Sequence, residues 1–346
     1  MTVKKLHLIS KWLPLFLAGL FTTIAFTSCK KDSGTSSIDG DWKRDGPFDG
    51  NVRSEAVTFT INDTVYIGGG YDGTNRLSDF WFLNKTGNYW KQVANFPGTP
   101  RSSAVAFSIN GKGYVGTGVD DNGNMLNDFW EFDPAKNTWT RKADFAGTPR
   151  YGSVGFAISG EGYIATGYDG TYLRDLWQYD PASDSWTQKA SLGGDKRTDA
   201  VEFTYQNKAY VVTGVNNGSY LSDFWVYDPS NDTWTAMRDI TNVSTDTYDD
   251  LYTSITRSNA MIFCTGDTAE LTCGNSSGVI GTTWEYDIAN DQWNQKTTFE
   301  GTARQGGVAY TVNGSGYIMG GNNSSNYLDD IWQFIPNVAA DPNDNN

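Results

Sequence analysis

The residues with the clearest chemical potential are six arginines that recur at intervals of 47 to 60 residues. A guanidinium group donates paired hydrogen bonds to a carboxylate, so each arginine suits either an acidic ligand or an aspartate of the protein itself. Internal pairing is the expected reading, and ligand binding stays open beside it. The six are Arg53, Arg101, Arg150, Arg197, Arg257 and Arg304.

Aspartates and tyrosines follow these arginines at repeated offsets. Five leucine-x-aspartate motifs supply Asp79, Asp128, Asp175, Asp223 and Asp330 as internal partners. The sixth has Thr282 instead, so Arg257 lacks its expected carboxylate. Partly exposed aromatic rings would suit either loop packing or stacking against a sugar or peptide. The candidate ligand-binding set therefore also contains Asp199, Tyr71, Tyr168, Tyr172, Tyr220 and Tyr327.

One carboxylate, Glu202, departs from its repeat position. Its counterparts are small or apolar, and a carboxylate in such surroundings is costly unless it is paired. Glu202 would serve as the base of a sugar-opening reaction, with Arg197 or Arg257 holding a substrate carboxylate. The counterparts are Thr58, Ala106, Gly155, Ile262 and Ala309.

Composition excludes several classes of function. The only histidine is His7, which lies in the predicted leader, so the mature chain has no imidazole for metal binding, general base work or a triad. Without the leader's three lysines the chain keeps 23 basic and 40 acidic residues, a net charge of −17. Nucleic acid and anionic lipid are thereby disfavoured. We expect no metal and no cofactor.

The elements that position these residues are six repeats of about 48 residues. In one repeat, Arg101 precedes the alternating run AVAFSI, and Asn110-Gly111 then turns the chain into GYVGTG. A polar loop leads to DFWEF, a DPAKN turn and TWTRK, which completes four strands. One tryptophan of the third strand marks each copy: Trp81, Trp130, Trp177, Trp225, Trp284 and Trp332.

The glycine doublet at Gly69-Gly70 and Gly320-Gly321, reduced to Thr-Gly in other copies, together with the later tryptophan, resembles the kelch repeat. This resemblance implies an all-β, six-bladed propeller of four-stranded blades over residues 40–336, whose ligands dock at the channel mouth. The last copy stops after its third strand, while the stretch around Trp42 is a lone fourth strand. We therefore predict that an N-terminal strand completes the last blade and closes the ring.

The resemblance extends to two kinds of kelch enzyme. The central domain of galactose oxidase shares this propeller, but its copper site depends on histidines that the mature chain lacks, so a copper radical oxidase is excluded. The propeller is also similar to the sialic-acid mutarotases. A non-catalytic module that binds a glycan, peptide or envelope protein is the preferred hypothesis, and a sugar mutarotase or epimerase is the alternative. We expect a monomer.

Two further features concern the region between the fourth and fifth repeats. An insertion of 12 residues follows Ala236, and we predict that it overhangs the channel mouth near Arg257. Cys264 and Cys273 would share one face of a hairpin but lie about four residues out of alignment, roughly 13 Å at the strand rise. That separation is too large for a disulfide, so we expect two unpaired, buried side chains.

The N-terminus predicts export. Three lysines precede an apolar run from Trp12 to Phe26, which is too short to span a bilayer unaided. The following Ser28-Cys29 resembles a lipoprotein cleavage site. We predict a signal peptide (1–28), a lipidated Cys29 with a flexible tether (29–39), and a disordered tail (337–346). The protein would then be anchored in a bacterial cell envelope, in the outer membrane, and would meet the membrane only through its lipid.

We expect the Cys29→Ala variant to move from the membrane fraction to the soluble fraction, because it removes the thiol that would carry the lipid. Cell fractionation and immunoblotting measure this. A variant that stays in the membrane fraction would contradict the lipid anchor.

Overall fold

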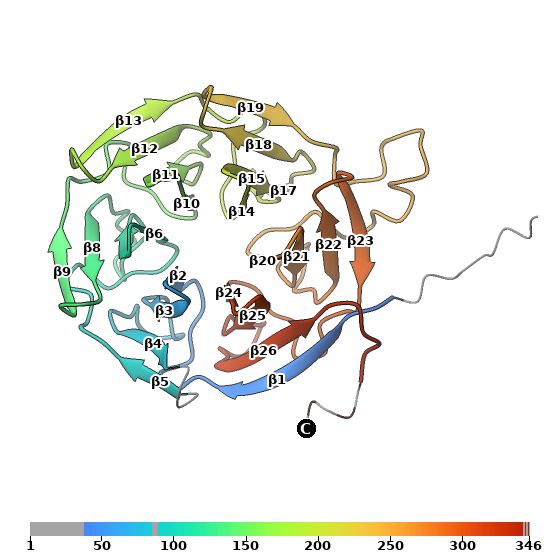
Figure 1. Cartoon of the computed structure of the whole chain (residues 1–346), viewed down its shortest axis with the longest axis horizontal. Helices are drawn as coiled ribbons and strands as arrows, with labels where there is room; N and C mark the ends of the chain where they lie inside the picture. The colour runs from blue at the N-terminus through green and yellow to red at the C-terminus, as the bar shows by residue number, and fades with distance from the viewer. Residues whose placement is uncertain (1–37, 85–88, 342, 344, 346) are drawn as a thin grey trace, which may run out of the picture. The chain divides into compact units, whose positions relative to one another are not determined.

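The protein is described by a computed structural model that covers residues 38–84, 89–341, 343 and 345. These residues form six four-stranded antiparallel sheets, arranged as blades around a central axis (Figure 1), and contain no helix. The predicted all-β, six-bladed propeller is therefore confirmed. Within the same ranges, no helix has the length and apolar character needed to cross a membrane.

The first three blades follow the chain order from the innermost strand outward. Blade one contains β2 (Val57–Ile61), β3 (Thr64–Gly68), β4 (Phe80–Asn84) and β5 (Tyr89–Gln92). Blade two contains β6 (Val105–Ile109), β7 (Lys112–Gly116), β8 (Phe129–Asp133) and β9 (Thr138–Arg141). Blade three contains β10 (Val154–Ile158), β11 (Glu161–Ala165), β12 (Leu176–Asp180) and β13 (Ser185–Lys189).

The other three blades repeat this order with two variations, a small extra hairpin in blade four and a borrowed strand in blade six. Blade four contains β14 (Val201–Tyr205), β15 (Lys208–Val212), β18 (Trp225–Asp228) and β19 (Thr233–Ala236), with the hairpin β16 (Val215–Asn216) and β17 (Ser219–Tyr220). Blade five contains β20 (Met261–Thr265), β21 (Thr268–Thr272), β22 (Thr283–Asp287) and β23 (Gln292–Lys296). Blade six contains β24 (Val308–Val312), β25 (Ser315–Met319), β26 (Asp330–Ile335) and β1 (Asp41–Pro47).

The ring closes as the sequence predicts. Strand β1 pairs antiparallel with β26, with Trp42 opposite Phe334, and lies beside it at the outer edge of blade six (Figure 1). The Trp42 side chain is fully buried, and its backbone N–H donates to Glu300 Oε2 at 3.2 Å. Because the first strand completes the last blade, blade six has the same four strands as the others.

The hydrophobic core lies between neighbouring blades. Between blades one and two, the Phe80 ring packs 4.9 Å from the Trp139 ring, and the Trp139 indole N–H donates to the Ala94 carbonyl at 2.9 Å. The strand-one Phe59 ring covers Gly113 so closely that a Cβ there would lie 2.2 Å from it. Gly113 is therefore required by the approach of the next blade.

Six residues at the channel mouth form a closed belt of backbone hydrogen bonds. Each belt residue has a left-handed backbone and donates its N–H to the carbonyl of the belt residue before it in the ring, at 2.6–3.0 Å. The belt passes through the closure, since Glu55 N–H donates to Gly306 at 2.6 Å. The mouth belt consists of Glu55, Ser103, Gly152, Asp199, Asn259 and Gly306.

The predicted unpaired state of the two internal cysteines is confirmed, because both are free. Cys273 is fully buried at the end of β21. Cys264 pairs across the hairpin with Ala269, and it is partly exposed and lines the channel rather than being buried as expected. Cys264 lies on the innermost strand of its blade, and its thiol donates to the Thr268 carbonyl at 3.1 Å.

The predicted leader, Cys29 and most of the tether lie outside the described residues. At the start of the described part, Asp39 contacts the Lys296 ammonium at 2.7 Å. In the predicted tail, Val338 accepts a hydrogen bond from Gly40 N–H at 2.7 Å. The disorder of the tail stays a prediction.

Candidate binding site at the channel mouth

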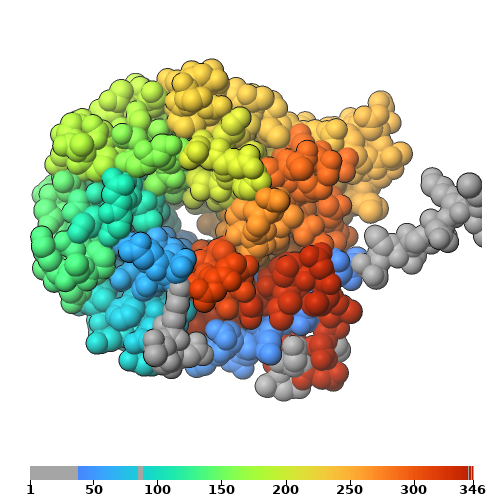
Figure 2. All heavy atoms as spheres, in the orientation of Figure 1, coloured from blue at the N-terminus to red at the C-terminus, as the bar shows by residue number. Residues whose placement is uncertain are grey.

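A central channel runs along the innermost strands of all six blades, and Figure 2 shows a narrow opening at the centre of the ring. It consists of three successive segments that share lining residues. The segment at the mouth belt has a volume of about 150 Å³, the middle segment about 190 Å³ and the far segment about 330 Å³. These volumes suit a small ligand or the tip of a larger one.

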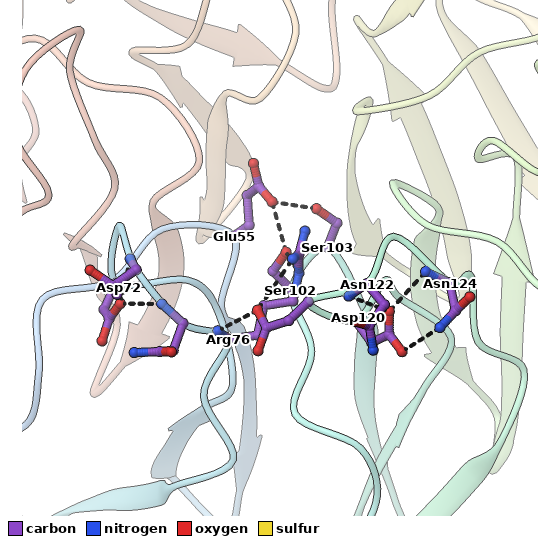
Figure 3. Close-up of polar contacts among 11 residues, drawn as sticks. Glu55, Asp72, Arg76, Ser102, Ser103, Asp120, Asn122 and Asn124 are labelled. Atoms are coloured by element: carbon purple, nitrogen blue, oxygen red, sulfur yellow. Dashed lines mark hydrogen bonds and ion pairs between the residues drawn. The ribbon is translucent and has the colours of Figure 1, made fainter.

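Acidic and hydroxyl side chains of the mouth belt line the first segment. Figure 3 shows the Glu55 carboxylate accepting hydrogen bonds from Ser102 and Ser103 of the next blade, at 3.0 and 2.7 Å. In the same view, Arg76 Nε donates to the Ser102 hydroxyl at 3.1 Å. The polar network at the mouth therefore bridges blades one and two.

Asp199 occupies the belt position three blades away from Glu55. Burial and then the charge of Glu55 raise the pKa of the Asp199 carboxyl to about 7, although a hydrogen bond from Thr198 opposes this. At neutral pH the group is therefore divided between its acid and its carboxylate. It can both donate to and accept from a hydroxyl at the mouth.

Glu202 lies deeper, where it borders both the middle and the far segment. Its neighbours in the lining are the small and apolar counterparts that its repeat position predicts, such as Ala106, Gly155 and Ile262. Burial raises the pKa of the Glu202 carboxyl to about 8. The residue lines the channel and makes no hydrogen bond or ion pair with another described residue, so its carboxyl is available for acid–base chemistry there.

The arginines form buried junctions between strands two and three of each blade. In blade one, Arg53 donates to both carboxylate oxygens of Asp79 at 3.0 and 2.8 Å and to the Gly69 carbonyl at 3.0 Å. Trp81 donates its indole N–H to the same carboxylate at 2.6 Å. Burial opposes ionisation of Asp79, but hydrogen bonding and the charge of Arg53 outweigh it and lower the pKa.

Equivalent pairs join Arg101 to Asp128, Arg150 to Asp175, Arg197 to Asp223 and Arg304 to Asp330. All six arginines of the ring are 0–2% exposed. This is the internal pairing expected from the sequence, and it leaves these side chains out of reach of a ligand at the mouth without rearrangement. Their predicted contact with a ligand stays a prediction that the geometry does not favour.

Among the described residues, Arg257 has no carboxylate partner, as the threonine at position 282 predicts. Its guanidinium donates to the carbonyls of Ile255, Cys273, Thr282 and Ser254 and to the Thr282 hydroxyl. Burial lowers the pKa of Arg257 to about 10. Protein oxygens therefore occupy its donors, and no acidic residue among the described part of the insertion pairs with it.

The insertion does not overhang the channel mouth, so that expectation was wrong. It projects from the perimeter of the ring between β19 and β23 (Figure 1). The Tyr252 ring packs 6.0 Å from the Trp284 ring, and its hydroxyl accepts a hydrogen bond from the backbone N–H of Trp293 in the outer strand β23 at 2.6 Å. The insertion is held outside because its aromatic side chains complete the core between blades four and five.

Three rim positions in each blade surround the mouth belt. The first is the residue after the ring arginine, the second is the residue after the glycine that ends strand two, and the third is the residue before the leucine of the leucine-x-aspartate motif or its counterpart. Short antiparallel bridges join the three positions. In blade three all three are tyrosines, with Tyr168 lying 5.6 Å from Tyr151 and 5.2 Å from Tyr172. The five tyrosines predicted as ligand contacts all occupy rim positions and are partly exposed.

Other tyrosines of the rim connect neighbouring blades. Tyr71 lies 5.6 Å from Tyr327 of blade six, and the Arg76 guanidinium lies 5.5 Å over the Tyr71 ring. The Tyr220 hydroxyl donates to Asn275 of blade five at 2.6 Å. The rim therefore carries aromatic faces beside amide, hydroxyl and carboxylate groups.

Sequence reasoning missed several mouth residues because their types differ from one repeat to the next. Glu55, Ser103 and Asn259 belong to the belt, and Tyr151 belongs to the rim. Their common signal is distance from the ring arginine, because the first rim residue of each blade follows it by one position and the belt residue by two. Within the described residues, no group of histidines, cysteines and acidic residues is arranged to hold a metal ion.

Comparison with known proteins agrees with this architecture. The family model of the KLHDC2/KLHL20/DRC7 Kelch-repeats domain matches residues 43–197, and the Kelch motif model matches residues 203–240. Together with the six regular blades, these matches make the chain a kelch-repeat β-propeller. No curated protein sequence matches it closely enough to count as a relative.

Among solved structures, the structure of YjhT is similar, with a TM-score of 0.68 and 18% sequence identity over 82% of this chain and 95% of that chain. At this identity the similarity establishes the fold alone. A total of 827 chains match at a significant level, so the fold does not select one function. The function has to be argued from the mouth and the channel.

A buried carboxyl in blade five gives a prediction for stability. Glu270 is fully buried where other blades have a tyrosine, and it accepts hydrogen bonds from Thr265 and Thr268 at 3.0 and 2.7 Å. Burial raises the pKa of Glu270 to about 7, so the folded protein holds this proton more tightly than the unfolded chain. The stabilisation is fully present below about pH 4.5 and is lost as the pH rises through 7.

We expect the melting temperature to fall between pH 5 and pH 8, and Glu270 accounts for part of that fall, on the order of 2 kcal/mol. Glu270→Gln should make the fall several degrees smaller, because an amide does not ionise. Differential scanning fluorimetry measures it, with Asp63→Asn at an exposed turn as the matched control. A variant with the parent's pH profile would contradict the role of Glu270.

Proposed function

We propose that this propeller is an envelope-tethered binding module that recognises a neutral glycan at its channel mouth. The envelope location rests on the export signal and Cys29. The glycan rests on the chemistry of the belt and rim. A peptide or an envelope protein would be a different occupant of the same face.

The proposal rests on the location of the positions at which the six repeats differ in residue type. Structural positions, such as the buried ring arginines and the third-strand tryptophans, are the same in every blade. Rim and belt positions change from blade to blade, and all of them gather around one end of the channel. A rigid scaffold with variable, partly exposed polar residues at one end is typical of a recognition surface.

The chemistry at this end favours a neutral sugar. Tyrosine rings offer flat apolar faces, and the acids and amides beside them offer hydrogen-bond acceptors for hydroxyl groups. The belt carries two carboxyl groups, those of Glu55 and Asp199. Among the described rim positions the cationic side chain is that of Arg76, which already pairs with Asp121. A strongly anionic ligand would meet these carboxylates, so it is disfavoured.

We expect Tyr168→Ala to weaken binding of a glycan by about tenfold, equivalent to about 1.4 kcal/mol, because it removes the central ring of the blade-three cluster. The ligand is first identified on a glycan array with residues 38–346, and affinities are then measured by calorimetry. Tyr89→Ala is the matched control, since Tyr89 is an exposed tyrosine on the outer strand β5. An array without any bound glycan, or equal affinities of Tyr168→Ala and the parent, would overturn the proposal.

A second candidate function, sugar mutarotase, is favoured by one specific observation, the position of Glu202. Its carboxyl lies in the channel, and no hydrogen bond or ion pair engages it within the described part of the chain. A pKa of about 8 lets it exchange a proton with a sugar hydroxyl near neutral pH. The arginine clamp expected for an anionic substrate is less favoured, because Arg197 and Arg257 are buried and engaged.

If the channel catalyses anomer exchange, Glu202→Gln should reduce the rate to that of the uncatalysed reaction, because an amide neither donates nor accepts the proton. The rate is followed by proton NMR on freshly dissolved single anomers of glucose, galactose and sialic acid. No acceleration by the parent protein, or equal acceleration by Glu202→Gln, would exclude this function.

A further inference from the structure

A cavity separate from the channel lies away from the mouth. It is a groove of about 520 Å³ between blades three and four, bordered by their strand-one-to-two turns and by the Asp228-Pro229-Ser230 turn. Because strand one runs away from the mouth, these turns are at the opposite end of the blades. The blade 3–4 groove is defined here by Glu161, Tyr163, Gln178, Asn207, Lys208 and Asp228.

The groove contains a reversal of charge relative to neighbouring blades. At the start of strand two, Lys112 of blade two pairs with Asp133 at 2.7 Å, and Lys208 of blade four pairs with Asp228 at 3.3 Å. The same position in blade three is Glu161, which lies beside Asp180 in the sheet. Where blades two and four have a cation–anion pair, blade three has two adjacent acids, and the other three blades have threonine or serine at the strand-two position.

Nothing in the described chain compensates Glu161. It makes no hydrogen bond or ion pair with another described residue, and its Oε2 is buried without a partner. Asp180 is already engaged by the Ala182 N–H at 2.8 Å and the Ser183 hydroxyl at 2.7 Å. Burial and then the charge of Asp180 raise the pKa of Glu161, which is the response of an acid that lacks a donor or cation.

The rest of the lining suits a ligand with hydroxyl groups. The Tyr163 hydroxyl accepts from Gln178 Nε2 at 3.2 Å, and Asn207 and Ser230 border the same space. The Pro229 ring adds an apolar surface. A volume of this size accommodates one or two sugar rings, and amide and hydroxyl side chains exchange hydrogen bonds with sugar hydroxyls.

We infer that the blade 3–4 groove is a second binding site, separate from the channel mouth, for an amino sugar whose ammonium group lies against Glu161. The ligand ammonium takes the place that the lysine holds in blades two and four. It donates to the Glu161 carboxylate and neutralises the pair of acids. The hydroxyl groups of the sugar reach the amides and hydroxyls of the lining.

Calorimetric titration with glucosamine tests this site, with glucose as the neutral control of the same shape. We expect glucosamine to bind, glucose to bind at least tenfold more weakly, and Glu161→Gln to weaken glucosamine by about tenfold or more, the range of a charge-assisted hydrogen bond. Asp144→Asn, an equal change of charge at an exposed pair with Arg141, should leave the affinity unchanged.

A second variant guards against misfolding. Glu161→Lys restores the lysine–aspartate pair of blades two and four, so it should keep the parent's melting temperature and abolish glucosamine binding. Equal binding of glucose and glucosamine, or undiminished binding by both Glu161 variants, would overturn the site. Tighter binding of a lysine-containing peptide than of glucosamine would overturn the assignment to an amino sugar.

Discussion

The buried ring arginine is the interaction on which each blade and its neighbour depend. Its side chain ties the end of strand two to the start of strand three, as Arg101 does through the Thr117 carbonyl and Asp128. Its backbone carbonyl accepts the N–H of the strand-two glycine from the preceding blade, as Arg101 accepts from Gly70 at 2.8 Å. That glycine needs a left-handed backbone, with φ of 91° at Gly70, and a Cβ there would lie 2.7 Å from the Ser54 carbonyl. The arginine therefore recurs because of its side-chain contacts, and the glycine recurs because of this close approach of backbone atoms.

Because the ring arginines and glycines hold the blades together, the residues at the channel mouth are left free to vary. Two residues after each arginine, the belt hydrogen bond is made by backbone atoms alone, so any side chain that tolerates a left-handed backbone is accepted. The ring contains Glu55, Ser103, Asp199 and Asn259 at these positions, with glycine at the other two. The geometry of the mouth is thus fixed while its chemistry is free to differ. A binding surface built in this way changes its ligand without disturbing closure.

Much of this could be predicted from the sequence, because it repeats. The interval between tryptophans predicted the blades, the lone strand at Trp42 predicted closure, and the arginine and aspartate offsets predicted the junctions. Features made by a single copy were harder. The insertion was wrongly placed over the mouth, since its position in the chain does not reveal that Tyr252 packs against blade five. The belt could not be predicted because its residues share a backbone conformation rather than a residue type. The unpaired state of Glu161 could not be predicted either, because it depends on the strand register that places Asp180 beside it.

The departures that cost folding free energy are the informative ones. Glu161, Asp199, Glu202 and Glu270 are acids with raised pKa values, and all lie in blades three to five. Glu270 has two threonine donors and is a structural substitute for a tyrosine. Glu202 and Glu161 have no comparable partner within the described chain, and each lines a cavity. Since other blades fold with small, apolar, hydroxyl or lysine side chains at those positions, the fold does not require these acids, and the two cavities that they line are where we propose ligands to bind.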